Sequence, residues 1–334
     1  MLKLIVCLGL PLFGWSQIQV FFPKTSPTEH QRALITLASG QILSGSNEAN
    51  IRIHGSNGQV LQNSQLGAQF KETRDLAQTP NGFIALQSHD SSGLVLLNNA
   101  LAIDTFIYPL GKRVPLFLDG ICAQENLVFL LGDPVDGFFS TFLSKDGGLH
   151  WKTTNQKVSA SEGEAAYAAS GQTNQIYNGC FYFVSGGLES RLISSADQGN
   201  TWNTSKLPYP SCPTCGPYAM AVQTEKEIMT VGGNYLEPNN AQNTCFYTTD
   251  GGQTWKAPKK GPSGYRSCVI YAENKYFACG TNGIDVSKNG GKTWKKISDQ
   301  NSLSMVMVDQ QLIVSLANGG WLLIKIKTQI LHLG

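Results

Sequence analysis

Arginine, carboxylate and tyrosine side chains recur at two kinds of position in this sequence: where short apolar segments begin, and just after such segments end. Arginine can hold a ligand carboxylate through two parallel hydrogen bonds, and a carboxyl group beside a tyrosine can transfer protons. The same charges could instead neutralise one another, and the sequence leaves both possibilities open. No residue is assigned a catalytic role. The candidate ligand-binding residues are Arg32, Arg74, Asp119, Asp133, Asp136, Glu164, Arg191, Tyr235, Tyr265 and Arg266.

Four segments with a shared pattern must help to position these side chains. Residues 144–151, 195–202, 248–255 and 287–294 each follow Ser/Thr-x-Asp/Asn-x-Gly-x-x-Trp. In a hairpin turn, the Asp or Asn side chain can accept backbone N–H groups, and Gly can adopt a positive φ. The Trp then returns on the next strand and packs into the core of its own sheet. We therefore predict structural roles, not acid catalysis or calcium binding, for Asp146, Trp151, Asp197, Trp202, Asp250, Trp255, Asn289 and Trp294.

The spacing of these hairpins predicts a β-propeller. The four tryptophans lie 51, 53 and 39 residues apart, which is typical of blades with four strands each. Residues 54–61 have the same frame, with Leu61 in the Trp place, and a degenerate copy is expected near 97–100. Residues 17–334 are thus predicted to form one all-β, seven-bladed propeller, with six or eight blades as alternatives. The seven expected strand openings begin near Arg32, Arg74, Asp119, Glu164, Ala219, Arg266 and Ser304.

The two ends of the chain carry their own signals. Residues 18–22 have no blade of their own, so we predict that they pair with residues 321–327 and close the ring, which removes an exposed edge. Before them, Lys3 and the apolar residues 4–13 are typical of a signal peptide. We expect residues 1–16 to be removed after Ser16, which makes the protein secreted or periplasmic.

Charge and cysteine content narrow the possible partners. The formal net charge of +2 gives too weak a field to favour nucleic acid or an anionic membrane, and no later segment is apolar enough to span a bilayer. We expect a monomer. The Pro-rich loop around Cys212 and Cys215 favours a local disulfide over redox catalysis. Cys268 and Cys279 could face each other across a hairpin or be small buried residues, and we favour the second. The five histidines are too scattered for a metal site, and no cofactor motif is present.

The hairpin motif is that of the Asp-box, or bacterial neuraminidase repeat. Over residues 30–325 the sequence resembles exported bacterial relatives of the photosystem II stability/assembly factor-like family. The additional strings that carry this resemblance lie at 132–137, 162–164, 186–191 and 264–268. The resemblance implies a scaffold that binds other proteins, although a photosystem partner does not follow from it. Relatives are often named oxidoreductases, but no dinucleotide-binding loop, haem motif or flavin signature supports that name here.

Two functions therefore compete. In a propeller, the starts of the innermost strands and the loops between second and third strands share one face, which surrounds the central channel. The leading hypothesis is a non-catalytic scaffold that recognises a protein or glycan on this face. The alternative is a sialidase-like glycoside hydrolase, although the Phe-Arg-Ile-Pro motif of sialidases is absent. It would use Arg32, Arg74 and Arg266 as a carboxylate clamp, Tyr265 with Glu164 as nucleophile, and Asp119 as acid.

Overall fold

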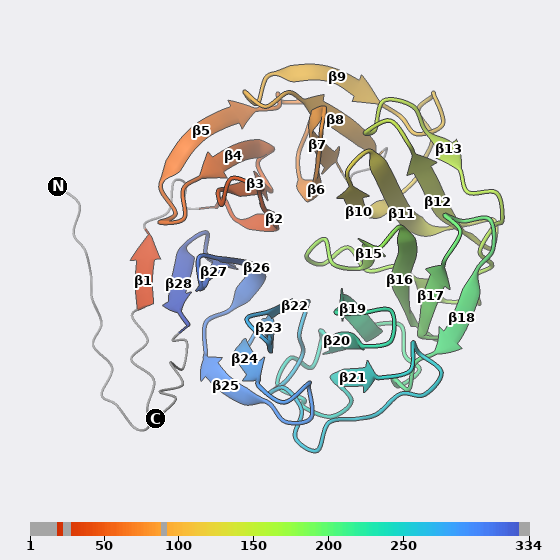
Figure 1. Ribbon diagram of the computed structural model, residues 1–334, viewed down its shortest axis with the longest axis vertical. Helices are drawn as coiled ribbons and strands as arrows, with labels where there is room; N and C mark the ends of the chain where they lie inside the picture. Colours follow the sequence, from red (N-terminus) through yellow and green to blue (C-terminus); the bar gives the residue numbers. More distant parts are fainter. Residues whose placement is uncertain (1–18, 23–27, 88–91, 327–334) are drawn as a thin grey trace, which may run out of the picture.

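The computed structural model describes residues 19–22, 28–87 and 92–326, which form a ring of seven antiparallel sheets (Figure 1). Each sheet is one blade, so the predicted seven-bladed all-β propeller is confirmed. The expected signal peptide, residues 1–16, and its cleavage point lie outside the described residues. Within the described ranges the chain forms no helix, and therefore none of the length and hydrophobicity that a helical membrane span requires.

The first three blades each contain four strands, ordered from the axis to the rim. Blade 1 consists of β2 (Gln31–Thr36), β3 (Ile42–Ser46), β4 (Asn50–His54) and β5 (Val60–Gln65). Blade 2 consists of β6 (Thr73–Thr79), β7 (Gly82–Gln87), β8 (Gly93–Leu97) and β9 (Ile103–Ile107). Blade 3 consists of β10 (Leu118–Gln124), β11 (Leu127–Val135), β12 (Phe138–Ser144) and β13 (Lys152–Thr153).

Blade 4 departs from the expected strand positions. Its four strands are β15 (Asn174–Tyr177), β16 (Cys180–Gly187), β17 (Arg191–Ser195) and β18 (Asn203–Lys206). The prediction that its innermost strand opens at Glu164 is wrong, because the two-residue β14 (Glu164–Ala165) pairs only with the far end of β16. Residues 166–173 form a loop instead, here called the axis loop. Figure 1 shows the chain before β15 reaching into the centre of the ring.

The remaining blades complete the circle. Blade 5 has β19 (Cys215–Val222), β20 (Ile228–Asn234) and β21 (Cys245–Thr248), with a single bridge between Tyr247 and Lys256 in the fourth place. Blade 6 has β22 (Cys268–Ala272), β23 (Lys275–Gly280), β24 (Gly283–Ser287) and β25 (Lys295–Ser298). Blade 7 has β26 (Ser302–Val308), β27 (Gln311–Leu316), β28 (Trp321–Lys325) and β1 (Gln19–Phe22). The predicted closure is confirmed, since β1 pairs antiparallel with β28.

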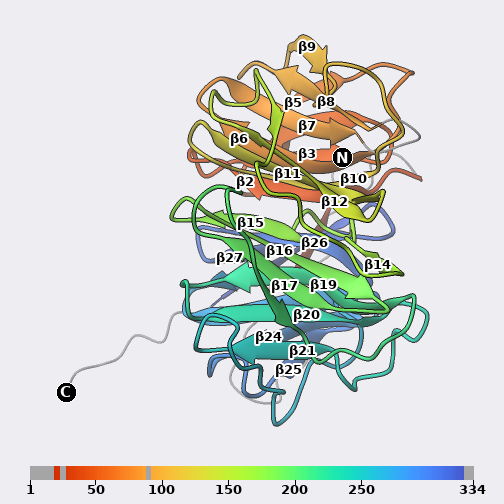
Figure 2. The same cartoon turned by 90° about the vertical axis from the view of Figure 1, so that its right-hand side faces the viewer.

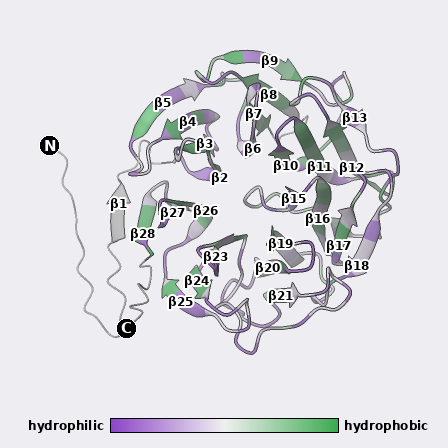
Figure 3. Cartoon of the chain, in the orientation of Figure 1, coloured by the Kyte–Doolittle hydropathy of each residue, from purple (hydrophilic) through white to green (hydrophobic). Residues whose placement is uncertain are grey.

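The apolar core lies between neighbouring blades. Strands β7 and β8 are buried at every position, whereas the rim strand β5 is almost entirely exposed. Second and third strands have neighbouring blades on both faces, which accounts for their continuous apolar sequences. Figure 3 shows hydrophobic colour on inner strands such as β8 and β11 and hydrophilic colour on the rim strand β18, and Figure 2 shows the strands crossing the thickness of the ring.

The hairpin tryptophans join one blade to the preceding one. Trp294 of blade 6 packs with Met229 of blade 5, and the ring of Trp202 in blade 4 lies 6.0 Å from that of Phe129 in blade 3. The tryptophans thus pack at blade interfaces, not only inside their own sheets as the sequence suggested. Because each interface contains apolar side chains from two blades, removing one tryptophan should weaken the contact between both.

Each hairpin between a third and a fourth strand is held by side-chain hydrogen bonds. Ser144 Oγ accepts from Gly148 N at 2.9 Å and donates to Asp146 Oδ1 at 2.8 Å, which also accepts from His150 N at 3.0 Å. Gly148 has a φ of 93°, which residues other than glycine rarely adopt. A Cβ there would also lie 2.4 Å from Ile84 of blade 2, so both the backbone angle and the close packing require glycine. The same acceptor role falls to Asp197, Asp250 and Asn289.

Candidate functional site

A cavity of about 490 Å³ opens at the centre of the ring, on the face where innermost strands begin. Six of the ten candidate residues line it. Arg32 and Arg74 come from blades 1 and 2, Asp119 and Asp133 from blade 3, and Tyr235 and Tyr265 from loops of blades 5 and 6. The other lining residues were not predicted from the sequence; they are Phe117, Ala165, Ala166, Tyr167, Ala168, Ala169, Pro213 and Tyr218.

The axis loop forms one wall of this cavity and is fixed by hydrogen bonds to other blades. Ser170 Oγ donates to the carbonyl of Ser267 in blade 6 at 2.7 Å, and the carbonyl of Gln172 accepts from Met220 N in blade 5 at 2.9 Å. The loop therefore connects blades 4, 5 and 6 across the axis. The 55-residue interval between the expected openings at Glu164 and Ala219, longer than the others, was the one sequence signal of this insertion.

Tyrosine rings form the aromatic side of the cavity. Tyr167 stacks on Tyr218 with ring centroids 4.2 Å apart, and Tyr265 meets Tyr218 edge-on at 4.9 Å. Tyr235 lies further out, 6.3 Å from Tyr218, and is half exposed. Burial raises the pKa of Tyr167 to about 12 and raises the pKa of Tyr218 and Tyr265 as well, so these phenols are neutral at pH 7.

A disulfide-closed loop supports two of these tyrosines. Cys212 and Cys215 are joined by a disulfide, and Pro213 between them lines the cavity. Tyr167 Oη donates to the Pro213 carbonyl at 3.0 Å, and Tyr218 Oη donates to the following carbonyl, also at 3.0 Å. The loop thus orients aromatic side chains. Elsewhere, Cys268 and Cys279 face each other across the β22–β23 hairpin of blade 6, and both are buried free thiols. They are therefore both cross-hairpin neighbours and small buried residues, the two alternatives considered from the sequence.

Arg32 and Arg74, which line the same cavity, share one carboxylate. Arg32 Nε lies 3.3 Å from Glu72 Oε1, and Arg74 Nη2 lies 3.1 Å from Glu72 Oε2. Arg74 Nη1 also donates to the Ala168 carbonyl at 3.2 Å, and its guanidinium lies 5.9 Å from the centre of the Phe117 ring. The Nε groups of both arginines are buried and lack an aligned hydrogen-bond acceptor.

Two carboxyl groups complete the site. The Asp119 residue is 1% exposed, and neither of its carboxylate oxygens has a hydrogen-bond partner among the described residues. Burial raises the pKa of Asp119 well above its ordinary value, and the neighbouring Asp133 charge raises it further, whereas the positive charge of Arg74 acts in the opposite direction. Asp133 Oδ1 accepts from Ala166 N at 3.0 Å, and burial raises the pKa of Asp133 to about 6.

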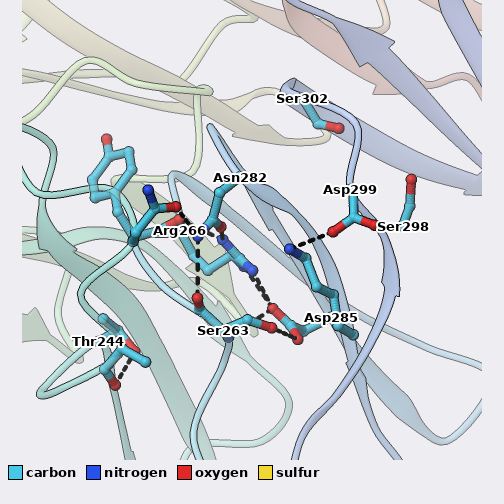
Figure 4. A network of polar contacts seen from close by, with 12 residues as sticks. Thr244, Ser263, Arg266, Asn282, Asp285, Ser298, Asp299 and Ser302 are labelled. Atoms are coloured by element: carbon cyan, nitrogen blue, oxygen red, sulfur yellow. Dashed lines mark hydrogen bonds and ion pairs between the residues drawn. The ribbon is translucent and has the colours of Figure 1, made fainter.

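Arg266 does not join the other two arginines. Its side chain is fully buried, and its Nε donates to Asp285 Oδ2 at 2.8 Å while Nη1 donates to the Tyr265 carbonyl at 2.7 Å. Its remaining donors reach Asn282 and Asp285. Figure 4 shows Arg266, Asn282 and Asp285 pointing toward one another within blade 6, with Ser263 bonded to the same carboxylate. The expected three-arginine cluster therefore does not form.

Three further candidates also lie elsewhere. Glu164 and Arg191 form a two-bonded ion pair, with Nε–Oε1 and Nη2–Oε2 distances of 2.7 Å each. Asp136 is exposed in the turn between β11 and β12. The sialidase-like set thus loses its third arginine and the glutamate that would assist Tyr265. In the described ranges there is also no cluster of three His, Cys, Asp or Glu residues able to hold a metal ion.

Comparisons with known proteins support the propeller class. The model of the Sortilin-Vps10 family, described as sortilin, neurotensin receptor 3, matches residues 139–279. No curated protein matches.

Similar solved structures all share the propeller shape at low sequence identity. YCF48 bound to D1 peptide aligns with a TM-score of 0.61 and 13% identity, covering 95% of this chain and 99% of that one. The virginiamycin B lyase of Staphylococcus aureus gives 0.65 and 10%, covering 93% and 100%. The GH74 xyloglucanase of Xanthomonas campestris gives 0.66 and 11%, covering 92% of this chain and 53% of that one. At such identities the likeness concerns the fold alone.

Proposed function

We propose that this chain is a non-catalytic binding propeller that takes a segment of another protein into its central cavity. The observation that carries this proposal is an aromatic-lined cavity surrounded, on the same face, by exposed apolar side chains. Six of these lie directly before β10, or where the second and third strands of blades 3, 4 and 5 connect: Phe117, Val135, Phe138, Leu188, Tyr235 and Leu236. Exposed apolar groups that surround a cavity favour a protein ligand.

The chemistry of the cavity also favours binding over catalysis. The phenols of Tyr167 and Tyr218 donate to backbone carbonyls, and burial opposes their ionisation, so neither is prepared to act as a nucleophile. A propeller of similar shape has been captured with a peptide, as the YCF48 structure is described. That likeness supports the finer proposal of an Asp-box scaffold related to photosystem assembly factors, without naming a partner.

Selection from a random peptide display library tests the proposal. The wild-type protein should enrich a defined set of peptides, and Leu188→Ala should weaken their binding because this side chain lies beside the cavity. Leu149→Ala is the matched control, since Leu149 is 47% exposed against 45% for Leu188 but lies in the β12–β13 turn on the opposite face. Failure to enrich any peptide, or equal losses from both variants, would contradict the proposal.

We also propose that the protein is exported, on the basis of residues 1–16. Sequencing the N-terminus of protein purified from its source should find Gln17 first. A mature chain that begins at Met1 would contradict export.

A glycoside hydrolase remains the second candidate because Asp119 and Asp133 stand in one cavity with raised pKa values, as proton donors require. A panel of aryl-glycosides, including sialosides, assayed from about pH 4 to 8 addresses it. Turnover that Asp119→Asn abolishes would favour hydrolysis over pure binding, whereas no turnover would exclude this class of substrate.

A further inference from the structure

The Asp119 carboxyl group is the least satisfied polar group of the cavity. It is almost completely buried, both of its oxygens lack hydrogen-bond partners among the described residues, and it lines the cavity. Buried polar groups are normally paired, and leaving one unpaired costs free energy. The nearby Arg74 does not fill this role, because its two terminal nitrogens bind Glu72 and the Ala168 carbonyl. A ligand with hydrogen-bond donors would satisfy Asp119.

The side chains around Asp119 favour a positively charged donor. Tyr167, Tyr218, Tyr235 and Tyr265 line the same cavity. Neutral aromatic rings attract cations through the negative potential of their faces. An ammonium group in this cavity would therefore meet both aromatic rings and a carboxylate.

The balance of charges points in the same direction. Two guanidinium groups, of Arg32 and Arg74, stand against three carboxyl groups, of Glu72, Asp119 and Asp133. Glu72 is shared by both arginines, whereas no ion pair reaches Asp119 or Asp133 within the described part of the chain. Burial opposes ionisation of Asp119, and a bound cation would favour its ionised form. The five groups would then carry a surplus of one negative charge, which the ligand cation would balance.

We propose that the cavity binds a primary ammonium group, the side chain of a lysine in the partner segment, with Asp119 as its counter-ion. A primary ammonium is favoured over a quaternary one because the unpartnered Asp119 oxygens need N–H donors, which a quaternary nitrogen lacks. This inference rests on the proposed peptide-binding function and specifies the side chain that the cavity recognises.

Binding of three small probes, followed by NMR of the protein, tests the ammonium site directly. The probes are Nα-acetyl-lysine N-methylamide, its norleucine counterpart without charge, and its Nε-trimethylated form. The wild type should bind the lysine probe at least about tenfold more tightly than the norleucine probe. The trimethylated probe should bind more weakly than the lysine probe. Equal or tighter binding of either counterpart, or no binding of the lysine probe, would overturn the proposal.

Substitution of the counter-ion supplies the second arm. Asp119→Asn should lower affinity for the lysine probe by at least about tenfold, because an amide keeps the shape but loses the charge. Asp136→Asn is the matched control, since Asp136 is an exposed carboxylate on the same face outside the cavity. Circular dichroism and thermal unfolding should find both variants folded. Unchanged affinity in folded Asp119→Asn would refute the assignment.

The two proposals can fail separately. If display enriches peptides without lysine, and these bind Asp119→Asn and wild type with equal affinity, the protein-binding function is supported and the ammonium site is contradicted. If the lysine probe binds through Asp119 but no peptide is enriched, the ammonium site stands and the peptide-binding function falls.

Discussion

Arginines near the start of the innermost strands are fully buried in blade 6 but partly exposed in blades 1 and 2. Arg266 is fully buried, and its donors all reach acceptors within its own blade or the loop before it. Arg32 and Arg74 stay partly exposed, share Glu72 and line the cavity. Arg266 lies two residues before β22, whereas Arg32 and Arg74 are the second residues of β2 and β6. Arg266 thus holds together its own blade, and the other two arginines face the cavity.

The difference arises from the third strand of each blade. In blade 6, the third residue of β24 is Asp285, the partner of Arg266. The corresponding residue is Arg52 in β4 of blade 1 and Val95 in β8 of blade 2. Arg266 is therefore paired with a buried carboxylate of the third strand in its own blade, whereas Arg32 and Arg74 share the partly exposed Glu72, which directly precedes β6. Residue type and strand position are therefore insufficient without the cross-strand partner.

The largest expected effect on stability comes from breaking the buried ion pair between Arg266 and Asp285 in blade 6. Arg266→Met should lower the free energy of unfolding by about 3–5 kcal/mol, because Asp285 would stay buried without its partner. Urea denaturation measures this loss. Adding Asp285→Leu should recover most of it, because the uncompensated charge is then removed. If Arg266→Met alone were as stable as wild type, the structural role of Arg266 would be contradicted.

A pH effect should come from the open cavity. The folded-state pKa of Asp133 is about 6, above the ordinary value of 3.8, so the fold favours its neutral form. Its contribution to stability is therefore complete below about pH 3.8 and is lost as pH rises through 6, by at most about 3 kcal/mol. Asp133→Asn should lose less stability than wild type between pH 4 and 7 in urea denaturation. Parallel pH profiles would show that burial does not perturb this group.

A smaller effect is expected from the disulfide beside the cavity. Replacing Cys212 and Cys215 with alanine should lower the free energy of unfolding by about 2 kcal/mol, since the bond closes only a four-residue loop. Affinity for the lysine probe should also fall, because Tyr167 and Tyr218 bind carbonyls of this loop. Unchanged affinity in the double variant would separate the loop from the binding site.

The smallest stability effect should come from replacing Arg74, one of the two arginines that line the cavity. Arg74→Met should change the free energy of unfolding by about 1 kcal/mol or less, because its ion pair with Glu72 is partly exposed. The same urea denaturation compares it with Arg266→Met. Equal losses of unfolding free energy from the two variants would contradict the distinction between the buried Arg266 and the partly exposed Arg74.

Much of the architecture could be predicted because it depends on local chemistry. The Asp, Gly and Trp of each hairpin determine a turn, and their spacing determined the blade count, with pairing of the chain ends following from the need to protect an edge. The axis loop could not be predicted in this way, since Glu164-Ala165-Ala166-Tyr167 has the pattern of a strand and its path depends on contacts with blades 5 and 6. Tyr167 was missed for that reason. The fate of Arg266 required the register that places Asp285 beside it.

A crystal structure of the protein with a display-selected peptide would test most directly whether the central cavity is the binding site. The account predicts that the peptide crosses the face of blades 3, 4 and 5 and that a lysine ammonium lies within hydrogen-bonding distance of Asp119. A peptide bound on the opposite face, with Asp119 still unpartnered, would contradict it.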